Sequence, residues 1–388
     1  MNTIWPAELD PHKASMKYGD RSVFATVSHV PAAPFDFVLP PELEASAPSE
    51  ARGFARDDVK LMVSRRQTDE IDHVTFRDIG QFLRAGDVLV INTAGTMNAA
   101  LPAIRPSGEV VELHLSTRLP NGNWSIELRS FKGDATIPLL TAHAGEHLTL
   151  PAGGAVRLIE PYTSSLATHE PINREAIAVR LWRAEVTFPS PQDAYLSEYG
   201  TPIRYGYVRE AWSPEYYQTV FATDRGSAEM PSAGRAFTAD LVTRLVAQGV
   251  QFAPILLHTG VASLEDHEPP YAEYFRVAAD TARIVNSARS AGRRIIAVGT
   301  TAIRALETAS SQDGHIEAGE GWTEVIVGPS TGIHSVDGLL TGLHEPRATH
   351  LMMLEALVNR ERLHIAYEQA VERRYLWHEF GDLHLIVP

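Results

Sequence analysis

The 388-residue sequence contains no cysteine, which excludes disulfides, thiolate nucleophiles and zinc sites built on sulfur. It also lacks any run of the ~18 uninterrupted apolar residues needed to cross a bilayer. Residues 1–20 have neither the basic nor the apolar segment of a signal peptide. We therefore expect a cytoplasmic protein with no membrane contact, whose chemistry depends on oxygen and nitrogen groups.

Positive charge is scarce as well, with 34 lysines and arginines against 48 acidic residues and a formal net charge of −14. Binding a nucleic acid along a whole face needs clustered cations, so this balance argues against such a surface. A local basic patch remains open near the end of the chain, although a solvated helical face explains the same arginines more simply. These arginines are Arg360, Arg362, Arg373 and Arg374.

Length and composition indicate a globular protein of two domains, because 44% of the residues are hydrophobic and only 21% are charged. Between residues 93 and 187, short strand-like runs alternate with turn clusters such as PNGN and AGG. The predicted strands are 110–116, 123–131, 146–152, 155–161 and 176–182. This spacing predicts an all-β unit, such as a small barrel.

On both sides of that region, strands alternate with segments of helical periodicity. The pattern therefore predicts a mixed α/β domain, residues 1–92 and 188–388, carrying an inserted β-barrel domain, residues 93–187. The predicted helices are 76–83, 237–250 and 274–292, and the predicted strands are 87–92, 251–260 and 293–301.

The stretch 334–353, HSVDGLLTGLHEPRATHLMM, places polar groups among many leucines and methionines. A dry surrounding strengthens each polar contact and makes each unpaired group costly. A site for a charged small molecule would have this character, and a satisfied buried network would look the same. The candidate functional residues here are Asp337, Thr341 and His344.

Three further segments combine a strand end or a helix start with polar residues. IIAVGTTAIRALE runs from a strand into a helix, and Thr300, Thr301 and Arg304 could present a helix start to an anion; a plain threonine N-cap is the alternative. His258 lies near the end of the predicted strand 251–260 and could act as a general base, or it could be a hydrogen-bonded core residue.

Glu273 follows His258 along the chain. The acidic and histidine residues of this segment do not have the spacing of a metal site. The loop YYQTVFATDRGSAEMPSAG precedes a helix and could expose amides to a carboxylate or a nucleobase edge. Its candidate residues are Gln218, Ser232 and Gly234. The loop has no phosphate-loop or dinucleotide-binding glycine pattern, which disfavours nucleoside triphosphates and NAD.

The order of short segments from about residue 35 to the end resembles one known family. LPPEL, GDVLVIN, YQTVFA, PSAG, VGTTAIRALE, GWTEVIVGPS, VDGLLTGLHEPRATHLMM and FGDLHLI follow one another. This order, and above all the VGTT and VDGLLT blocks, resembles the S-adenosylmethionine:tRNA ribosyltransferase-isomerase family of the queuosine pathway. The resemblance implies an α/β domain with an inserted β-barrel.

The resemblance also implies a reaction with S-adenosylmethionine as co-substrate and tRNA as acceptor. We separately expect no metal and a monomer. In that family the ribosyl group of S-adenosylmethionine is transferred to the aminomethyl group of a 7-deazaguanine base, with release of adenine and methionine. The sulfonium acidifies the neighbouring C5′ proton, so a moderate base in a dry site could remove it. Our candidates for proton transfer are His258, Asp337 and His344.

The other candidates divide into two groups. Thr300, Thr301 and Arg304, together with Thr341, are expected to hold S-adenosylmethionine, since a helix start and a guanidinium form a good carboxylate receptor. Gln218, Ser232, Gly234 and Glu273 are expected to contact the acceptor base.

Some positions depart from the family pattern. Gly95 and Ala100 stand where the family has arginines, and Ala236 stands where it has a histidine in PTAGLHF. Loss of two cations from a nucleic-acid surface should weaken phosphate binding. Two hypotheses therefore stay open: a ribosyltransferase-isomerase, acting on tRNA or on another acceptor, and a binding module that keeps S-adenosylmethionine without the reaction.

Overall fold

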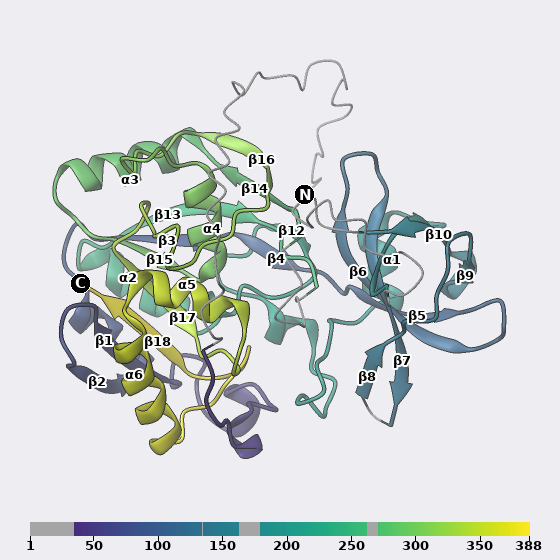
Figure 1. The fold of residues 1–388 in the computed structure, drawn as a ribbon, viewed down its shortest axis with the longest axis horizontal. Coiled ribbons are helices and arrows are strands. Elements are labelled where there is room, and N and C mark those ends of the chain that lie inside the picture. Colours follow the sequence, from purple (N-terminus) through teal and green to yellow (C-terminus); the bar gives the residue numbers. More distant parts are fainter. Residues whose placement is uncertain (1–34, 134, 163–178, 262–270) are drawn as a thin grey trace. The chain divides into compact units, whose positions relative to one another are not determined.

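The computed structural model describes residues 35–133, 135–162, 179–261 and 271–388 (Figure 1). In these ranges, nine strands form a mixed sheet in the order β16-β14-β13-β3-β15-β17-β18-β1-β2. The strands are β1 (Lys60–Arg65), β2 (Ile71–Thr75), β3 (Val88–Asn92), β13 (Gln251–Leu257), β14 (Glu273–Val277), β15 (Ile295–Val298), β16 (Gly319–Thr323), β17 (Gly338–Gly342) and β18 (Leu383–Val387).

The centre of this sheet is parallel, because β3 pairs in parallel with β13 and with β15, and β15 pairs in parallel with β17. These strands are apolar along their length, as expected where both faces of a sheet are covered. Val88 and Val90 of β3 face one core, whereas Leu89 and Ile91 face the other. This alternation follows from the two-residue period of a strand.

Helices cover both faces of the sheet. The core that contains Val88 and Val90 also holds apolar residues of α3 (Ala279–Ser290), α4 (Thr300–Thr308), α5 (Thr349–Leu357) and α6 (Arg360–Glu372). The opposite core is covered by α2 (Ala239–Ala247) and the 3-10 helix η3 (Phe76–Phe82). Shorter 3-10 turns are η1 (Pro41–Leu43), η2 (Glu50–Arg52), η4 (Pro151–Gly153), η5 (Pro214–Tyr217) and η6 (Ser232–Gly234).

A second, antiparallel sheet closes on itself as a barrel. Its order is β11-β10-β9-β5-β6-β7-β8, and β11 also pairs with β7, which completes the ring and leaves β8 outside it. α1 (Gln192–Tyr199) packs against the barrel core through Tyr195. The strands are β5 (Ala100–Ile104), β6 (Val110–Arg118), β7 (Trp124–Lys132), β8 (Ala135–Pro138), β9 (His147–Thr149), β10 (Ala155–Pro161) and β11 (Leu181–Thr187).

Two short parallel strands, β4 (Ala94–Thr96) and β12 (Asp224–Ser227), form a separate ladder beside the main sheet. Gln218 holds this ladder in place, because its amide bonds both the N–H and the C=O of Thr96, at 3.1 and 2.9 Å. The segment that leaves β3 is thereby fixed before it enters the barrel.

The predicted fold class, a mixed α/β fold with a small barrel, is confirmed. The predicted domain boundaries stay a prediction, and the described contacts join residues 35–388 into one compact unit. None of the described helices combines the length and the apolar character required to cross a membrane.

Two local predictions need correction. The helix expected over 274–292 begins only at Ala279, since the preceding residues form the antiparallel strand β14. Their aromatic and β-branched side chains favour a strand. The amphipathic segment at 76–83 is a 3-10 helix rather than an α-helix. Of the predicted strand 176–182, the part before residue 179 lies outside the described residues.

Candidate active site

A cavity of about 670 Å³ opens where the parallel strands of the main sheet end. Gly299 and Thr300 directly follow β15, Thr341 lies at the end of β17, and Thr259 follows β13; all four line the cavity. Ligands of α/β sheets gather at this edge, because loops and helix starts converge there. The position of the cavity thus matches that of a functional site.

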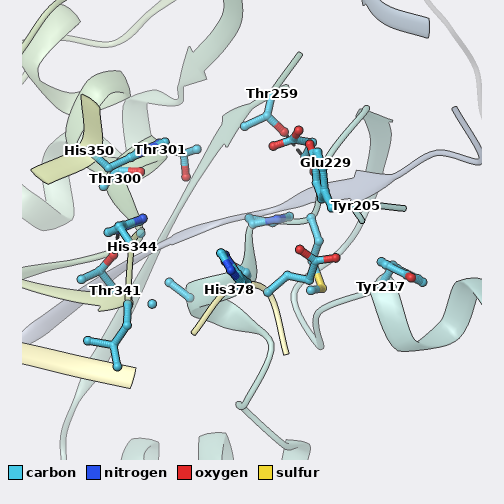
Figure 2. Close-up of a pocket in the computed structure, with 18 of the residues that line it drawn as sticks. Tyr205, Tyr217, Glu229, Thr259, Thr300, Thr301, Thr341, His344, His350 and His378 are labelled. Atoms are coloured by element: carbon cyan, nitrogen blue, oxygen red, sulfur yellow. Dashed lines mark hydrogen bonds between the residues drawn. The ribbon is translucent and has the colours of Figure 1, made fainter. Parts of the chain in front are cut away.

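The labelled side chains of the cavity form two groups (Figure 2). Figure 2 shows Thr300, Thr301, Thr341, His344 and His350 on one side and Tyr205, Tyr217 and Glu229 on the other, with His378 between them.

The first side is built on the start of α4. Gly299 adopts φ +91°, which an L-residue with a side chain rarely reaches, and this turn connects β15 directly to the helix. The first residues of α4 therefore present backbone N–H groups and the positive end of the helix dipole at the cavity. Asn92, at the end of β3, donates to the Thr301 hydroxyl at 3.3 Å and to the Leu257 carbonyl at 2.9 Å. The helix start is thus held against two strands.

His344 faces the cavity next to this helix start. Its Nε2 lies 2.9 Å from the Thr341 hydroxyl, and its ring stacks on His350 at 4.7 Å with an interplanar angle of 7°. Burial lowers the pKa of His344 well below its ordinary value of 6.5, and three neighbouring histidines lower it further. The imidazole is therefore neutral at neutral pH and able to accept a proton.

The other side of the cavity is aromatic and acidic. The Tyr207 hydroxyl donates to Glu379 at 2.5 Å, and the Tyr207 ring stacks on His378 at 3.9 Å. His378 lies 3.7 Å from Glu44 and 3.6 Å from Glu345. Burial raises the pKa of Glu379 to about 7.

The charge of the cavity has one sign. Four glutamates line it, and none of the described lining residues is a lysine or an arginine. The buried hydroxyl of Tyr205 also has no hydrogen-bond partner among the described residues. A ligand suited to this cavity carries positive charge and offers a polar group to Tyr205. The four glutamates are Glu44, Glu229, Glu345 and Glu379.

Comparison with known proteins identifies the family. A family model described as "Queuosine biosynthesis protein" matches residues 32–386. The chain belongs to this family. Relatives from Symbiobacterium thermophilum and Carboxydothermus hydrogenoformans, both named S-adenosylmethionine:tRNA ribosyltransferase-isomerase, are 35% and 33% identical to it, over 91% of this chain and 98% of theirs.

A solved structure is also similar to this member of the queuosine biosynthesis family. The crystal structure of an S-adenosylmethionine tRNA ribosyltransferase from Thermotoga maritima has 29% sequence identity and a TM-score of 0.48, and the match covers 91% of this chain and 99% of that one. The expected family and the expected enzyme class, a ribosyltransferase-isomerase, are confirmed by the named relatives.

The cavity brings together only part of the predicted site. Asp337 lies at the opposite end of β15, where its carboxylate accepts from the Ile295 N–H at 2.8 Å. His258 is half-buried beside Gly226, and the loss of solvent around its ring lowers its pKa. Neither side chain lines the cavity, whereas five predicted residues do. These five are Ser232, Thr300, Thr301, Thr341 and His344.

Arg304 and Glu273 bind each other instead of lining the cavity. Their side chains form a largely buried ion pair, and Glu273 also accepts from the Gly260 N–H at 3.0 Å. The pair therefore ties α4 to β14 and to the loop after β13. Gln218 holds the β4 ladder, and Gly234 is buried at the end of η6, where an added Cβ would lie 3.4 Å from Thr219.

The three positions that depart from the family pattern are all buried in this chain. Ala100 pairs with His114 inside the barrel, and Gly95 lies against Arg225 of β12. Ala236 belongs to the core under η3 and α2. Their effect on tRNA binding stays a prediction.

Sequence reasoning missed Tyr205, Tyr207, Glu345, His378 and Glu379. The two tyrosines lie in a segment without regular periodicity, and the last two follow Trp377 in a turn where His378 adopts φ +71°. The only signal for this pair was the repeated His-Glu dipeptide, since Glu345 also follows a histidine. That signal is too short to single out a site.

Proposed function

We propose that this protein transfers and isomerises the ribosyl group of S-adenosylmethionine onto a 7-aminomethyl-7-deazaguanine base in tRNA, which forms epoxyqueuosine. The observation that carries this proposal is the composition of one cavity: a helix start and a neutral histidine face a wall of tyrosines and carboxylates. Membership of the queuosine biosynthesis family supports the same reaction.

The donor matches the cavity in size and charge. A volume of about 670 Å³ lies within the range of roughly 300–1,000 Å³ that small-molecule pockets occupy. We assign the methionine carboxylate to the start of α4, with Thr300 and Thr301, because backbone N–H groups and the helix dipole attract an anion. The sulfonium and the ammonium group suit the carboxylates, and the adenine ring suits Tyr205 and Tyr207, which offer a stacking face and a free hydroxyl.

His344 is our candidate for the base that removes the C5′ proton. It is the one member of our predicted trio, with His258 and Asp337, that lines the cavity. Its lowered pKa keeps the ring nitrogen available at neutral pH, and Thr341 orients the ring. Substitution of His344 by glutamine should therefore reduce the rate of adenine release by about 10²-fold or more while S-adenosylmethionine still binds.

The acceptor tRNA places its modified nucleobase in this cavity, whereas its phosphates stay outside. The acidic lining of the cavity would repel phosphates, whereas the cationic aminomethyl group of the acceptor suits it. Proteins that modify a base in RNA take it out of the stack into such a pocket. We accordingly expect the tRNA backbone to remain outside the cavity, and a tRNA substrate implies a cytoplasmic enzyme.

The test is incubation of the protein with S-adenosylmethionine and tRNA that carries the deazaguanine base, with adenine and methionine measured by chromatography. Release of both products is expected, and tRNA with unmodified guanine should give none. Calorimetric binding of S-adenosylmethionine without release would support a binding module instead. Absence of both binding and release would refute the proposal.

A further inference from the structure

The carboxyl group of Glu379 has an unusual environment at the cavity wall. Among the described residues, one side chain bonds it, the Tyr207 hydroxyl, at 2.5 Å. Tyr207 in turn stacks on His378, so the bond is held between two rings rather than in open solvent. A carboxyl group that accepts from a tyrosine and faces a reaction cavity can exchange a proton with a bound substrate.

In the part of the chain that the structure describes, no cation forms an ion pair with Glu379. Tyr217, His378 and Glu345 face it from the neighbouring segments, and Glu345 disfavours its ionisation. Arg235, whose charge lowers the pKa of Glu379, is bonded elsewhere: it donates to Glu50 at 2.7 Å and to the Tyr216 carbonyl at 2.9 Å. Burial raises the pKa of Glu379 to about 7, which agrees with a carboxyl group that has no cation partner.

We propose that Glu379, oriented by Tyr207, is the acid that protonates the departing adenine and the base that then takes the proton of the acceptor amine. This inference rests on the proposed function, and it assigns a residue that the sequence did not point to. The adenine ring is placed near Glu379 because Tyr205 and Tyr207 form the aromatic side of the same cavity.

The proton balance closes over the reaction. When the bond between the ribose carbon and adenine breaks, its electron pair goes to adenine, and the neutral carboxyl group of Glu379 supplies the proton that adenine needs. The C5′–S bond breaks with its electron pair on sulfur, which gives methionine. The acceptor ammonium first gives one proton to solvent. When the resulting neutral amine forms its bond to carbon, it loses a second proton to the Glu379 carboxylate, which returns to its starting form. The C5′ proton taken by His344 is released to solvent, and it replaces the positive charge lost when the sulfonium becomes methionine.

The experiment measures single-turnover adenine release from the full-length protein with S-adenosylmethionine and deazaguanine-modified tRNA, between pH 5 and pH 9. Because Glu379 must begin protonated, the wild-type rate should fall as pH rises through about 7. Glu379→Gln keeps the shape and the bond from Tyr207 but cannot transfer a proton. It should lower the rate by about 10²-fold or more and abolish the fall above pH 7.

Two further variants sharpen the test. The hydrogen bond from Tyr207 lowers the pKa of Glu379, so Tyr207→Phe should move the fall in rate to higher pH. Glu368→Gln is the matched control, because Glu368 is exposed on α6 and does not line the cavity. The rate of adenine release and the pH profile of this variant should equal those of the wild type.

The outcomes separate this inference from the proposed function. If the wild type releases no adenine, the proposed function fails. If the wild type is active and Glu379→Gln keeps both its rate and the fall above pH 7, only the role of Glu379 is refuted. Should Glu379→Gln not fold, as judged by its melting temperature, an unshifted profile in Tyr207→Phe refutes the role equally.

Discussion

Glu50 offers a sharp test of how the cavity wall is held in place. Its carboxylate accepts from Arg235 and from Arg56, both at 2.7 Å. Arg235 is buried, and its guanidinium lies 5.1 Å above the Phe380 ring, next to Glu379. The pair thus connects η2 with η6 and with the turn that carries the cavity carboxyl. We predict that Glu50→Gln destabilises the fold in a pH-dependent way.

The magnitude follows from the pKa of Glu50. Burial alone would raise this pKa, but the hydrogen bonds from Arg235 and Arg56 outweigh burial and lower it from 4.5 to about 2. At ~1.36 kcal/mol per pH unit, the change corresponds to at most about 3.4 kcal/mol, and solvent screening of a partly exposed group reduces it to roughly 2 kcal/mol. Because the pKa is lowered on folding, this stabilisation is full above pH 4.5 and is lost as pH falls towards 2.

The assay is urea denaturation followed by tryptophan fluorescence at pH 7, 5 and 3, for the wild type and Glu50→Gln. The stability difference should be about 2 kcal/mol at pH 7 and should shrink at pH 3. Glu42→Gln is the control, because the exposed pair of Glu42 with Arg374, at 3.8 Å, should contribute at most about 1 kcal/mol. A difference that stays constant from pH 7 to pH 3 would show that the charge of Glu50 does not stabilise the fold.

Three other predictions concern residues near or expected in the site. Asp337→Asn should cost about 1 kcal/mol of stability in thermal unfolding, with an unchanged KM for S-adenosylmethionine, because Asp337 bonds a strand end far from the cavity. Arg304→Met alone should cost about 3 kcal/mol, and adding Glu273→Gln should restore part of it; additive costs would contradict a coupled pair. Thr341→Val should slow adenine release about 3- to 10-fold at unchanged donor affinity, since it removes the bond that orients His344, and an unaltered rate would exclude that role.

Sequence reasoning predicted the location of the cavity better than the set of residues that line it. Apolar runs that end in small polar residues pointed to Thr300, Thr301 and Thr341, which line the cavity because parallel strands bring their carboxyl ends to one edge. Asp337 lies only four residues before Thr341, yet β17 separates them by about 13 Å at ~3.3 Å per residue. Proximity in sequence therefore misled where a strand runs between two residues.

Arg304 shows a second limit of sequence reasoning. On a helix that begins at the cavity, a guanidinium is a plausible receptor for a carboxylate, but the side chain finds Glu273 on an edge strand instead. The sequence assigned that segment to a helix, so it gave no reason to expect a carboxylate opposite Arg304. Partners across a sheet depend on strand order, which local patterns do not specify.

The aromatic and acidic side of the cavity could not be predicted from the sequence for a related reason. Tyr207 and Glu379 are separated by 172 residues and meet because the segment after the barrel and the turn before β18 converge at the cavity. Neither segment has the period of a helix or a strand. Only the three-dimensional structure brings the pair together.

The two groups that we assign to proton transfer have protonation states opposite to those of the free side chains. In water near pH 6 a glutamate is ionised and about half or more of a histidine is protonated. In this cavity, burial raises the pKa of Glu379 to about 7 and lowers that of His344 well below 6.5. A neutral acid and a neutral base therefore coexist below pH 7, as a reaction that removes one proton and donates another requires.

The expected pH profile of adenine release is a bell whose basic limb belongs to Glu379 and whose acidic limb belongs to His344. Loss of the basic limb alone in Glu379→Gln would assign the two limbs, whereas loss of both limbs together would show that the two groups titrate as one system.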